Sequence, residues 1–183
     1  MQPWEQLPLV WPTRAKYFKW VTNQIRKAWS RHPIKVEFKK SKTFLAPLGK
    51  LKDKKTGLPK NVKCQECVMC GETFRDKDTQ VDHIGRAGAF KDWEDCAPYM
   101  KGLMHVTFDS LQILCKVCHD HKSYSENNNC SLDEAYARKS YILWKKNVPI
   151  PTQIELLAGE GYNDTSNEPK RKAAYLDLYR NAT

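Results

Sequence analysis

Cys115-Lys116-Val117-Cys118-His119-Asp120-His121-Lys122 ends the segment that decides the fold of this chain. The segment begins with Cys67-Val68-Met69-Cys70 and carries the dipeptide Asp82-His83 between the two cysteine pairs. Two Cys-x-x-Cys pairs supply the four thiolates of a tetrahedral zinc site, and two pairs at this spacing rarely arise by chance. A zinc ion bound to all four sulfurs would hold Asp82-His83 and the histidines after Cys118 in one small unit.

The first pair requires a choice, because Cys64, Cys67 and Cys70 form two overlapping Cys-x-x-Cys spacings. We assign Cys67 and Cys70, since Gly71 follows them and a glycine there permits the tight turn in which backbone amides approach the sulfurs. Cys64 is then spare. The alternative to a zinc site is that all the cysteines are buried free thiols. The two isolated cysteines are expected to be ordinary packing residues, and they are Cys96 and Cys130.

Length and composition indicate an intracellular globular protein. The chain has 183 residues, of which 40% are hydrophobic, enough for a small catalytic unit with extensions on both sides. No basic segment followed by an apolar run comes after Met1, and no run of about 18 apolar residues occurs, so we expect a cytoplasmic location and no membrane contact. The odd number of cysteines, 7 in all, favours metal binding over a disulfide framework.

The positive charge is concentrated in the N-terminal third. Residues 1–63 carry 16 lysine and arginine side chains against 3 acidic ones, whereas the remaining residues carry 15 against 18. Such asymmetry is typical of a surface that binds nucleic acid, although a basic face that is merely solvated is the plain alternative. We therefore expect double-stranded DNA as the partner of residues 1–63.

An amphipathic helix is predicted over Arg14–Trp29, with Thr13 as its cap. Its apolar residues share one face, and its basic residues lie largely off that face, so the helix can pack and bind phosphates at once. The residues that we expect to contact nucleic acid are Arg14, Lys16, Lys19, Arg26 and Lys27, together with Lys122 farther along the chain.

The rest of the chain divides into three segments: a basic N-terminal extension (1–63), a core (64–127) and a C-terminal helical extension (128–183). Within the first, Ile34–Phe38 alternates like a short strand, and residues 49–63 form a basic linker or a hairpin. In the third, a capping box at Ser131–Glu134 predicts a helix to about Lys146 that Pro149 and Pro151 end, with apolar positions Leu132, Ala135, Tyr136, Ile142 and Leu143 in helical phase. A linker (159–169) and a last short helix (170–180) follow.

The core places its chemical groups on two strands and one helix. Asp82 and His83 are neighbours at the end of a short strand, so their side chains leave on opposite faces. Leu111–Leu114 is predicted to form the second strand. His119, in the first turn of the following helix, can point back toward Asp82. His121 is roughly 200° farther around the helix axis, so we do not expect both histidines to bind one metal. The stretch between His83 and Ser110 is expected to be a long loop.

These motifs, from Cys67 to Lys122, resemble the zinc-knuckle form of the HNH endonuclease family. The matched segment covers about 60 of the 183 residues, and the N-terminal block is similar, more weakly, to small bacteriophage HNH proteins. The resemblance implies an α+β fold with a ββα-metal (His-Me finger) core. It further implies that His83 is the general base, that Asp82 and His119 bind a catalytic Mg²⁺ or Mn²⁺ ion, and that four cysteines hold a structural zinc: Cys67, Cys70, Cys115 and Cys118.

The chain departs from the family at one position. The middle Asn of the family motif, which orients the catalytic His or joins the metal shell, falls at Ser110; we expect Ser110, or Asp109 beside it, to substitute by hydrogen bonding. The expected function is a metal-dependent DNA endonuclease with a role in phage homing, packaging or degradation of host DNA. The alternatives are a catalytically silent zinc protein that binds nucleic acid, and a structural phage component.

Overall fold

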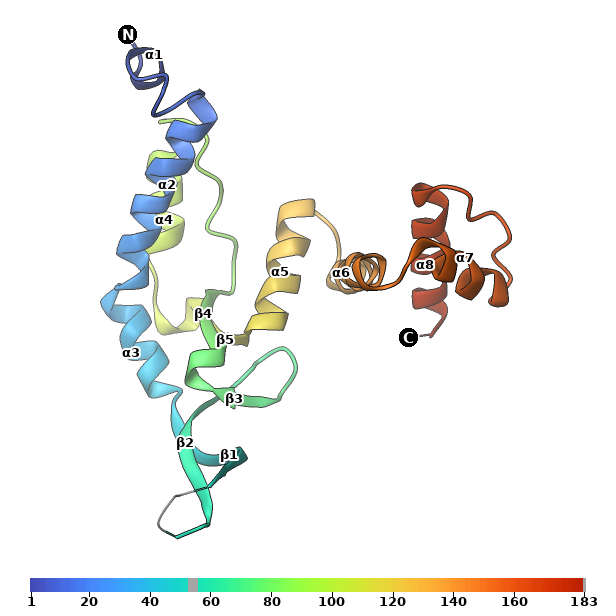
Figure 1. Ribbon diagram of the computed structural model, residues 1–183. Helices are drawn as coiled ribbons and strands as arrows, with labels where there is room; N and C mark the ends of the chain where they lie inside the picture. Colours follow the sequence, from blue (N-terminus) through green and yellow to red (C-terminus); the bar gives the residue numbers. More distant parts are fainter. Residues whose placement is uncertain (53–55, 183) are drawn as a thin grey trace. The chain divides into compact units, whose positions relative to one another are not determined.

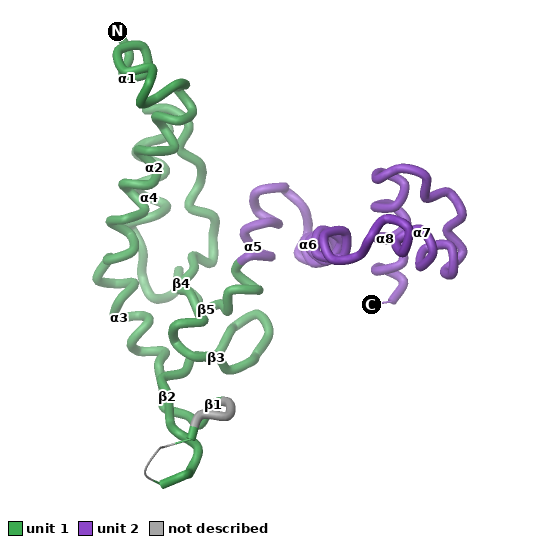
Figure 2. Tube along the Cα trace, in the orientation of Figure 1, with its two compact units in different colours: residues 1–119 green, residues 120–183 purple. Residues whose placement is uncertain are grey.

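The computed structural model describes residues 1–52 and 56–182 and shows a mixed α and β protein in which many more residues lie in helices than in strands (Figure 1). The chain forms two compact units, residues 1–119 and residues 120–183 (Figure 2). Strand β2 (Pro59–Glu66) continues across the predicted boundary at residue 63, so the basic extension and the start of the predicted core belong to the same unit. None of the described helices is long and apolar enough to cross a membrane.

The first unit begins with helices α1 (Pro3–Gln6) and α2 (Arg14–Ser30). The prediction for α2 is confirmed, including its cap, because the Thr13 hydroxyl oxygen accepts a hydrogen bond from the Lys16 amide at 3.3 Å. An N-cap of this kind satisfies one of the amides that a helix leaves unpaired at its start.

Helix α3 (Pro33–Ser41) replaces the short strand predicted over Ile34–Phe38. Five alternating residues do not separate the two structures, because Ile34 and Phe38 are also spaced four apart, as one face of a helix requires. Pro33 favours the helix, since its fixed φ suits the first position of a helix. Phe38 is then buried in the core at 3% exposure, while Val36 on the other side is 53% exposed.

A three-stranded antiparallel sheet follows, formed by β1 (Phe44–Lys52), β2 and β3 (Thr73–Arg75) in that order. Its first two strands confirm the hairpin alternative for residues 49–63, of which residues 53–55 lie outside the described part of the chain. A short 3-10 turn, η1 (Asp76–Asp78), leads from β3 to the next strand.

The predicted Asp-His strand and its partner pair with each other. Strands β4 (Thr79–His83) and β5 (Leu111–Cys115) are antiparallel, with Asp82 opposite Gln112 and His83 opposite Leu111. A 3-10 turn, η2 (Phe108–Ser110), directly precedes β5. Helix α5 (Lys116–Asn128) begins directly after β5.

The long loop predicted between His83 and Ser110 is wrong in its second half, where α4 (Cys96–Met104) forms. Tyr99 and Leu103 are buried at the four-residue spacing of one helix face. The signal was hidden by Pro98 and Gly102, which lower helix propensity. Gly102 has a packing reason, because a Cβ atom there would lie 2.7 Å from the carbonyl oxygen of Ala87.

One hydrophobic core joins the N-terminal helices to the β4–β5 ribbon. Side chains from α2, α3, α4, β4, β5 and the segment between β4 and α4 form it: Phe18, Trp29, Phe38, Val81, Phe90, Tyr99, Leu103, Leu111 and Ile113. Because three large aromatic residues of this core come from residues 1–63, deleting the basic extension would unfold the first unit instead of testing nucleic-acid binding. Point substitutions on its surface are the informative change.

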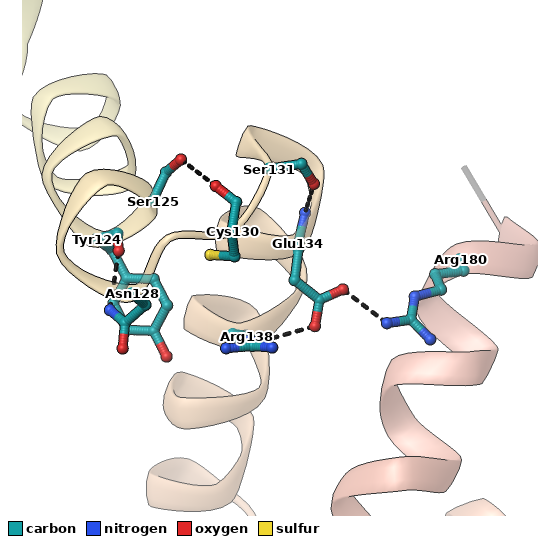
Figure 3. A network of polar contacts seen from close by, with 8 residues as sticks. All are labelled: Tyr124, Ser125, Asn128, Cys130, Ser131, Glu134, Arg138 and Arg180. Atoms are coloured by element: carbon teal, nitrogen blue, oxygen red, sulfur yellow. Dashed lines mark hydrogen bonds and ion pairs between the residues drawn. The ribbon is translucent and has the colours of Figure 1, made fainter.

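The second unit holds α6 (Leu132–Asn147), α7 (Ile150–Gly159) and α8 (Glu168–Ala182). The capping of α6 is as predicted, since the Ser131 hydroxyl accepts from the Glu134 amide at 3.1 Å. The Glu134 carboxylate lies between Arg138, at 2.7 Å, and Arg180 of α8, at 2.6 Å (Figure 3). These contacts tie α6 to α8.

Two expectations for the second unit need correction. The buried face of α6 consists of Ala135, Ala137 and Tyr141, whereas Ile142 and Leu143 are 48% and 61% exposed. Pro149 and Pro151 end α6 but also open the additional helix α7, because proline is well tolerated in the first turn of a helix.

Candidate metal centre and active site

The four predicted cysteines meet at one point of the first unit. Cys67 and Cys70 lie in the turn after β2, where Gly71 has a φ of +71° and its amide donates to the Cys67 carbonyl at 2.8 Å. Cys115 ends β5 and Cys118 lies in the first turn of α5. The Val68 amide joins the turn to β5 through the Ile113 carbonyl at 3.0 Å. These local contacts bring all four Sγ atoms within 4.8 Å of one another.

The cluster fits a zinc ion. Bonds of about 2.3 Å to four tetrahedral sulfurs place the sulfurs about 3.8 Å apart, which agrees with the 4.8 Å limit of the cluster. Burial raises the pKa of the Cys67 thiol, but hydrogen bonds from the backbone of Cys115, Cys70 and Met69 outweigh it and bring that pKa to about 7. A partly formed thiolate among three further sulfurs is an environment that a divalent cation stabilises.

The other cysteines lie outside the cluster. Cys64 is fully buried with its Sγ 3.9 Å from the Ala46 carbonyl oxygen, and it is not one of the four grouped sulfurs. Cys96 opens α4 and Cys130 precedes α6, both partly exposed. The choice of Cys67 over Cys64 for the first pair therefore matches the geometry.

Asp82 and His119 lie side by side in the first unit, and His119 directly follows Cys118 in the sequence. The distance from Asp82 Oδ1 to His119 Nε2 is 3.7 Å, and the other carboxylate oxygen accepts a hydrogen bond from Gln112 Nε2 at 2.9 Å. Strand β4 places Asp82 and the first turn of α5 places His119, so the cysteine ligands that precede His119 also fix its position. The two side chains are 15% and 30% exposed, which leaves them accessible to solvent.

The spacing of these two donor atoms can be compared with that of two ligands of one metal ion. With bonds of about 2.1 Å to an oxygen and a nitrogen, two ligands of one metal are about 3.0 Å apart at a right angle and about 4.2 Å apart when opposite. The observed 3.7 Å lies between these limits. No third acidic, histidine or cysteine side chain joins them in a metal-sized group within the described residues, so water or substrate would have to complete the coordination.

His83 leaves the strand on the opposite face from Asp82. Its ring packs against Trp29 in a tilted arrangement with centroids 4.4 Å apart, and its Nε2 lies 3.0 Å from the Leu103 carbonyl oxygen. A carbonyl oxygen only accepts, so in this hydrogen bond Nε2 is the donor. The packing against Trp29 and this contact together orient the ring.

The Ser110 hydroxyl makes two hydrogen bonds to the backbone of Thr107: it donates to the carbonyl at 2.8 Å and accepts from the amide at 3.0 Å. Its own carbonyl accepts from the Ile84 amide at 2.9 Å, which extends the β4–β5 pairing by one step. The structure thus places Ser110 in the capping box of η2, whose N-cap is Thr107. The catalytic role expected for it stays a prediction, and the orienting contact to His83 comes from Leu103.

The six basic residues predicted to bind nucleic acid have different surroundings. On α2, Lys16 and Lys19 are exposed, Arg14 lies 3.7 Å from Asp92, Arg26 donates to the Tyr99 hydroxyl at 3.1 Å, and Lys27 donates to Gln24 at 3.2 Å. Lys122 belongs to the second unit, where it pairs with Glu126 and its side chain is 14% exposed. His121 is also in that unit and stacks on Tyr136 with centroids 4.0 Å apart.

Three groups that contact Asp82 or His83 were not predicted from the sequence: Gln112, Trp29 and the Leu103 carbonyl. Gln112 had a signal, because it is the one polar residue in the apolar strand Leu111–Cys115 and faces the same side as Asp82 across the register. Trp29 and Leu103 had none, since both reach His83 only through the packing of α2 and α4.

Comparison with protein-family models, with curated proteins and with solved structures finds no match. The site is therefore described by its own geometry: a four-sulfur cluster that can hold a metal ion, Asp82 and His119 with donor atoms 3.7 Å apart, and the His83 imidazole on the other face of the same strand.

Proposed function

We propose that this protein is a metal-dependent DNA endonuclease of the HNH type, in which β4, β5 and the start of α5 act as a ββα-metal core. The observation that carries the proposal is the 3.7 Å spacing of Asp82 and His119. The residue after Asp82 is His83, whose imidazole is oriented by its contact with the Leu103 carbonyl. A zinc ion in the cysteine cluster would give this arrangement its rigidity.

Phosphodiester hydrolysis needs a base for the attacking water and positive charge near the phosphate. His83 would take the water proton on Nδ1, while Nε2–H stays bound to the Leu103 carbonyl. Asp82 and His119 would hold Mg²⁺ or Mn²⁺, which when bound supplies charge stabilisation at the phosphate oxygens. Gln112 holds the Asp82 carboxylate in place through its second oxygen.

The metal step is tested with a labelled DNA duplex and increasing Mn²⁺. We expect Asp82→Asn and His119→Ala to raise the Mn²⁺ concentration for half-maximal cleavage, or to abolish cleavage, because each removes one of two protein ligands. His121→Ala is the matched control, since His121 stacks on Tyr136 in the second unit. Equal metal dependence for His119→Ala and His121→Ala would contradict the assignment.

Gln112→Leu tests the positioning of Asp82. Removing the 2.9 Å hydrogen bond to Asp82 should lower metal affinity by roughly 10-fold to 100-fold, the usual cost of losing a partner of a metal ligand. Gln80→Leu, the same change at an exposed position of β4, should leave the metal dependence unchanged. If both variants titrate like the wild type, Gln112 has no positioning role.

The second candidate is a zinc protein that binds nucleic acid without cutting it. The observation in its favour is the local bonding of Ser110, whose hydroxyl is held by Thr107 in place of the Asn expected from the resemblance. It predicts zinc and DNA binding in a protein that cuts no DNA with any divalent ion.

A further inference from the structure

A groove on the first unit has a strong positive lining outside the residues predicted to bind nucleic acid. Its volume is about 560 Å³, and the lysines Lys35, Lys39, Lys40 and Lys63 line it. Three come from α3 and the fourth from β2, so two elements separated in sequence build one surface. We call these four residues and the space between them the lysine groove.

The charge of the lysine groove is not neutralised by its surroundings. Among the described residues that line it, Asp76 is the one acidic residue, and Lys39 donates to the backbone carbonyl of Asp76 at 2.7 Å. Glu37 lies 3.5 Å from Lys40, but both side chains are largely exposed, and such surface pairs contribute little. The groove therefore presents an excess of positive charge.

The surroundings of Lys35 disfavour the positive charge of its side chain. Burial lowers the pKa of Lys35, and the positive charge of Lys39, one helical turn away, lowers it further. Like charges four residues apart on a helix repel each other. A bound anion would relieve both effects at once.

Lys35 of the lysine groove and the candidate general base contact the same indole. Lys35 Nζ lies 5.0 Å from the centroid of the Trp29 ring, and the His83 ring packs against that indole with centroids 4.4 Å apart. One side chain thus contacts both the groove and the imidazole. On the β hairpin, Leu45 pairs with Lys63 in the register and also lines the groove, so the lining is continuous from α3 onto the sheet.

We propose that the lysine groove binds the phosphate backbone of duplex DNA and guides the strand toward His83. The charge spread over two elements suits a polyanion with regularly spaced phosphates better than a single small anion. This inference rests on the proposed function for the identity of the ligand. It assigns phosphate contacts to α3 and β2, in addition to the contacts expected from α2.

The test is equilibrium binding of a labelled DNA duplex to the zinc-loaded full chain without added magnesium or manganese, across a range of KCl concentrations. We expect Lys40→Gln with Lys63→Gln, two exposed positions, to weaken binding roughly tenfold and to reduce the slope of log affinity against log salt by about 2, because two phosphate contacts are lost. The matched control is Lys91→Gln with Lys101→Gln, also exposed and in the first unit, which should bind within about twofold of wild type. Zinc content and circular dichroism confirm folding of each variant.

The outcomes separate this inference from the proposed function. An unchanged slope in the Lys40/Lys63 variant, or an equal loss in the control pair, overturns the groove. Binding that does not depend on salt would indicate a protein partner and also overturns it. If wild type binds DNA and the groove variant does not, the groove stands even if no condition yields cleavage, whereas wild type that binds no DNA overturns both proposals.

Discussion

Replacing Cys118 with alanine should remove the bound zinc and unfold the first unit. The four sulfurs lie within 4.8 Å of one another and connect the turn after β2 to the end of β5 and the start of α5. Binding of structural zinc contributes about 10–16 kcal/mol in small zinc domains, as much as the whole stability of a typical domain. We expect metal analysis to find about one zinc per wild-type chain and none in the variant.

The controls are the two cysteines outside the cluster. Cys96→Ser and Cys130→Ser should retain zinc and shift the unfolding temperature little, because both residues are partly exposed. Circular dichroism and thermal unfolding report the loss of structure in Cys118→Ala. A well-folded wild-type protein without zinc would refute the metal centre.

Replacing His83 with alanine should reduce cleavage by about 10²–10⁴-fold, the usual contribution of general acid-base catalysis. DNA affinity and its salt dependence should remain, since the base acts on water and not on the phosphate contacts. Single-turnover cleavage and equilibrium binding measure the two effects separately. His105→Ala, at an exposed histidine of the same unit, should cleave at the wild-type rate.

His83→Gln guards against a purely structural explanation. Because His83 packs on Trp29, alanine at this position also removes a core contact. Glutamine can still donate a hydrogen bond to the Leu103 carbonyl, but it cannot take a proton near neutral pH. Cleavage by His83→Gln at the wild-type rate would show that the imidazole is not the base.

Local signals carried most of what could be predicted. The caps at Thr13 and Ser131 located α2 and α6, because capping depends only on residues within one turn. The cysteine pairs located the four-sulfur cluster, because each Cys-x-x-Cys spacing brings its own two sulfurs together and leaves the fold to join only two pairs.

Features that depend on packing between distant segments were not predicted. Ile34–Phe38 fits a strand or a helix, and the core that buries Phe38 decides between them. The residues around His83 come from α2 and α4, which lie far from it in sequence, so no spacing could show that Trp29 packs against the imidazole. The lysine groove likewise exists only where α3 meets the β hairpin.

The most direct measurement of the central claim is a time course of supercoiled-plasmid cleavage by the pure, zinc-loaded wild-type protein. The proposed mechanism predicts nicked or linear products with Mg²⁺ or Mn²⁺, intact plasmid when neither ion is added, and intact plasmid with His83→Ala under all conditions. A wild-type protein that contains zinc and binds DNA, yet cuts neither duplex nor single-stranded DNA with any divalent ion, would contradict it.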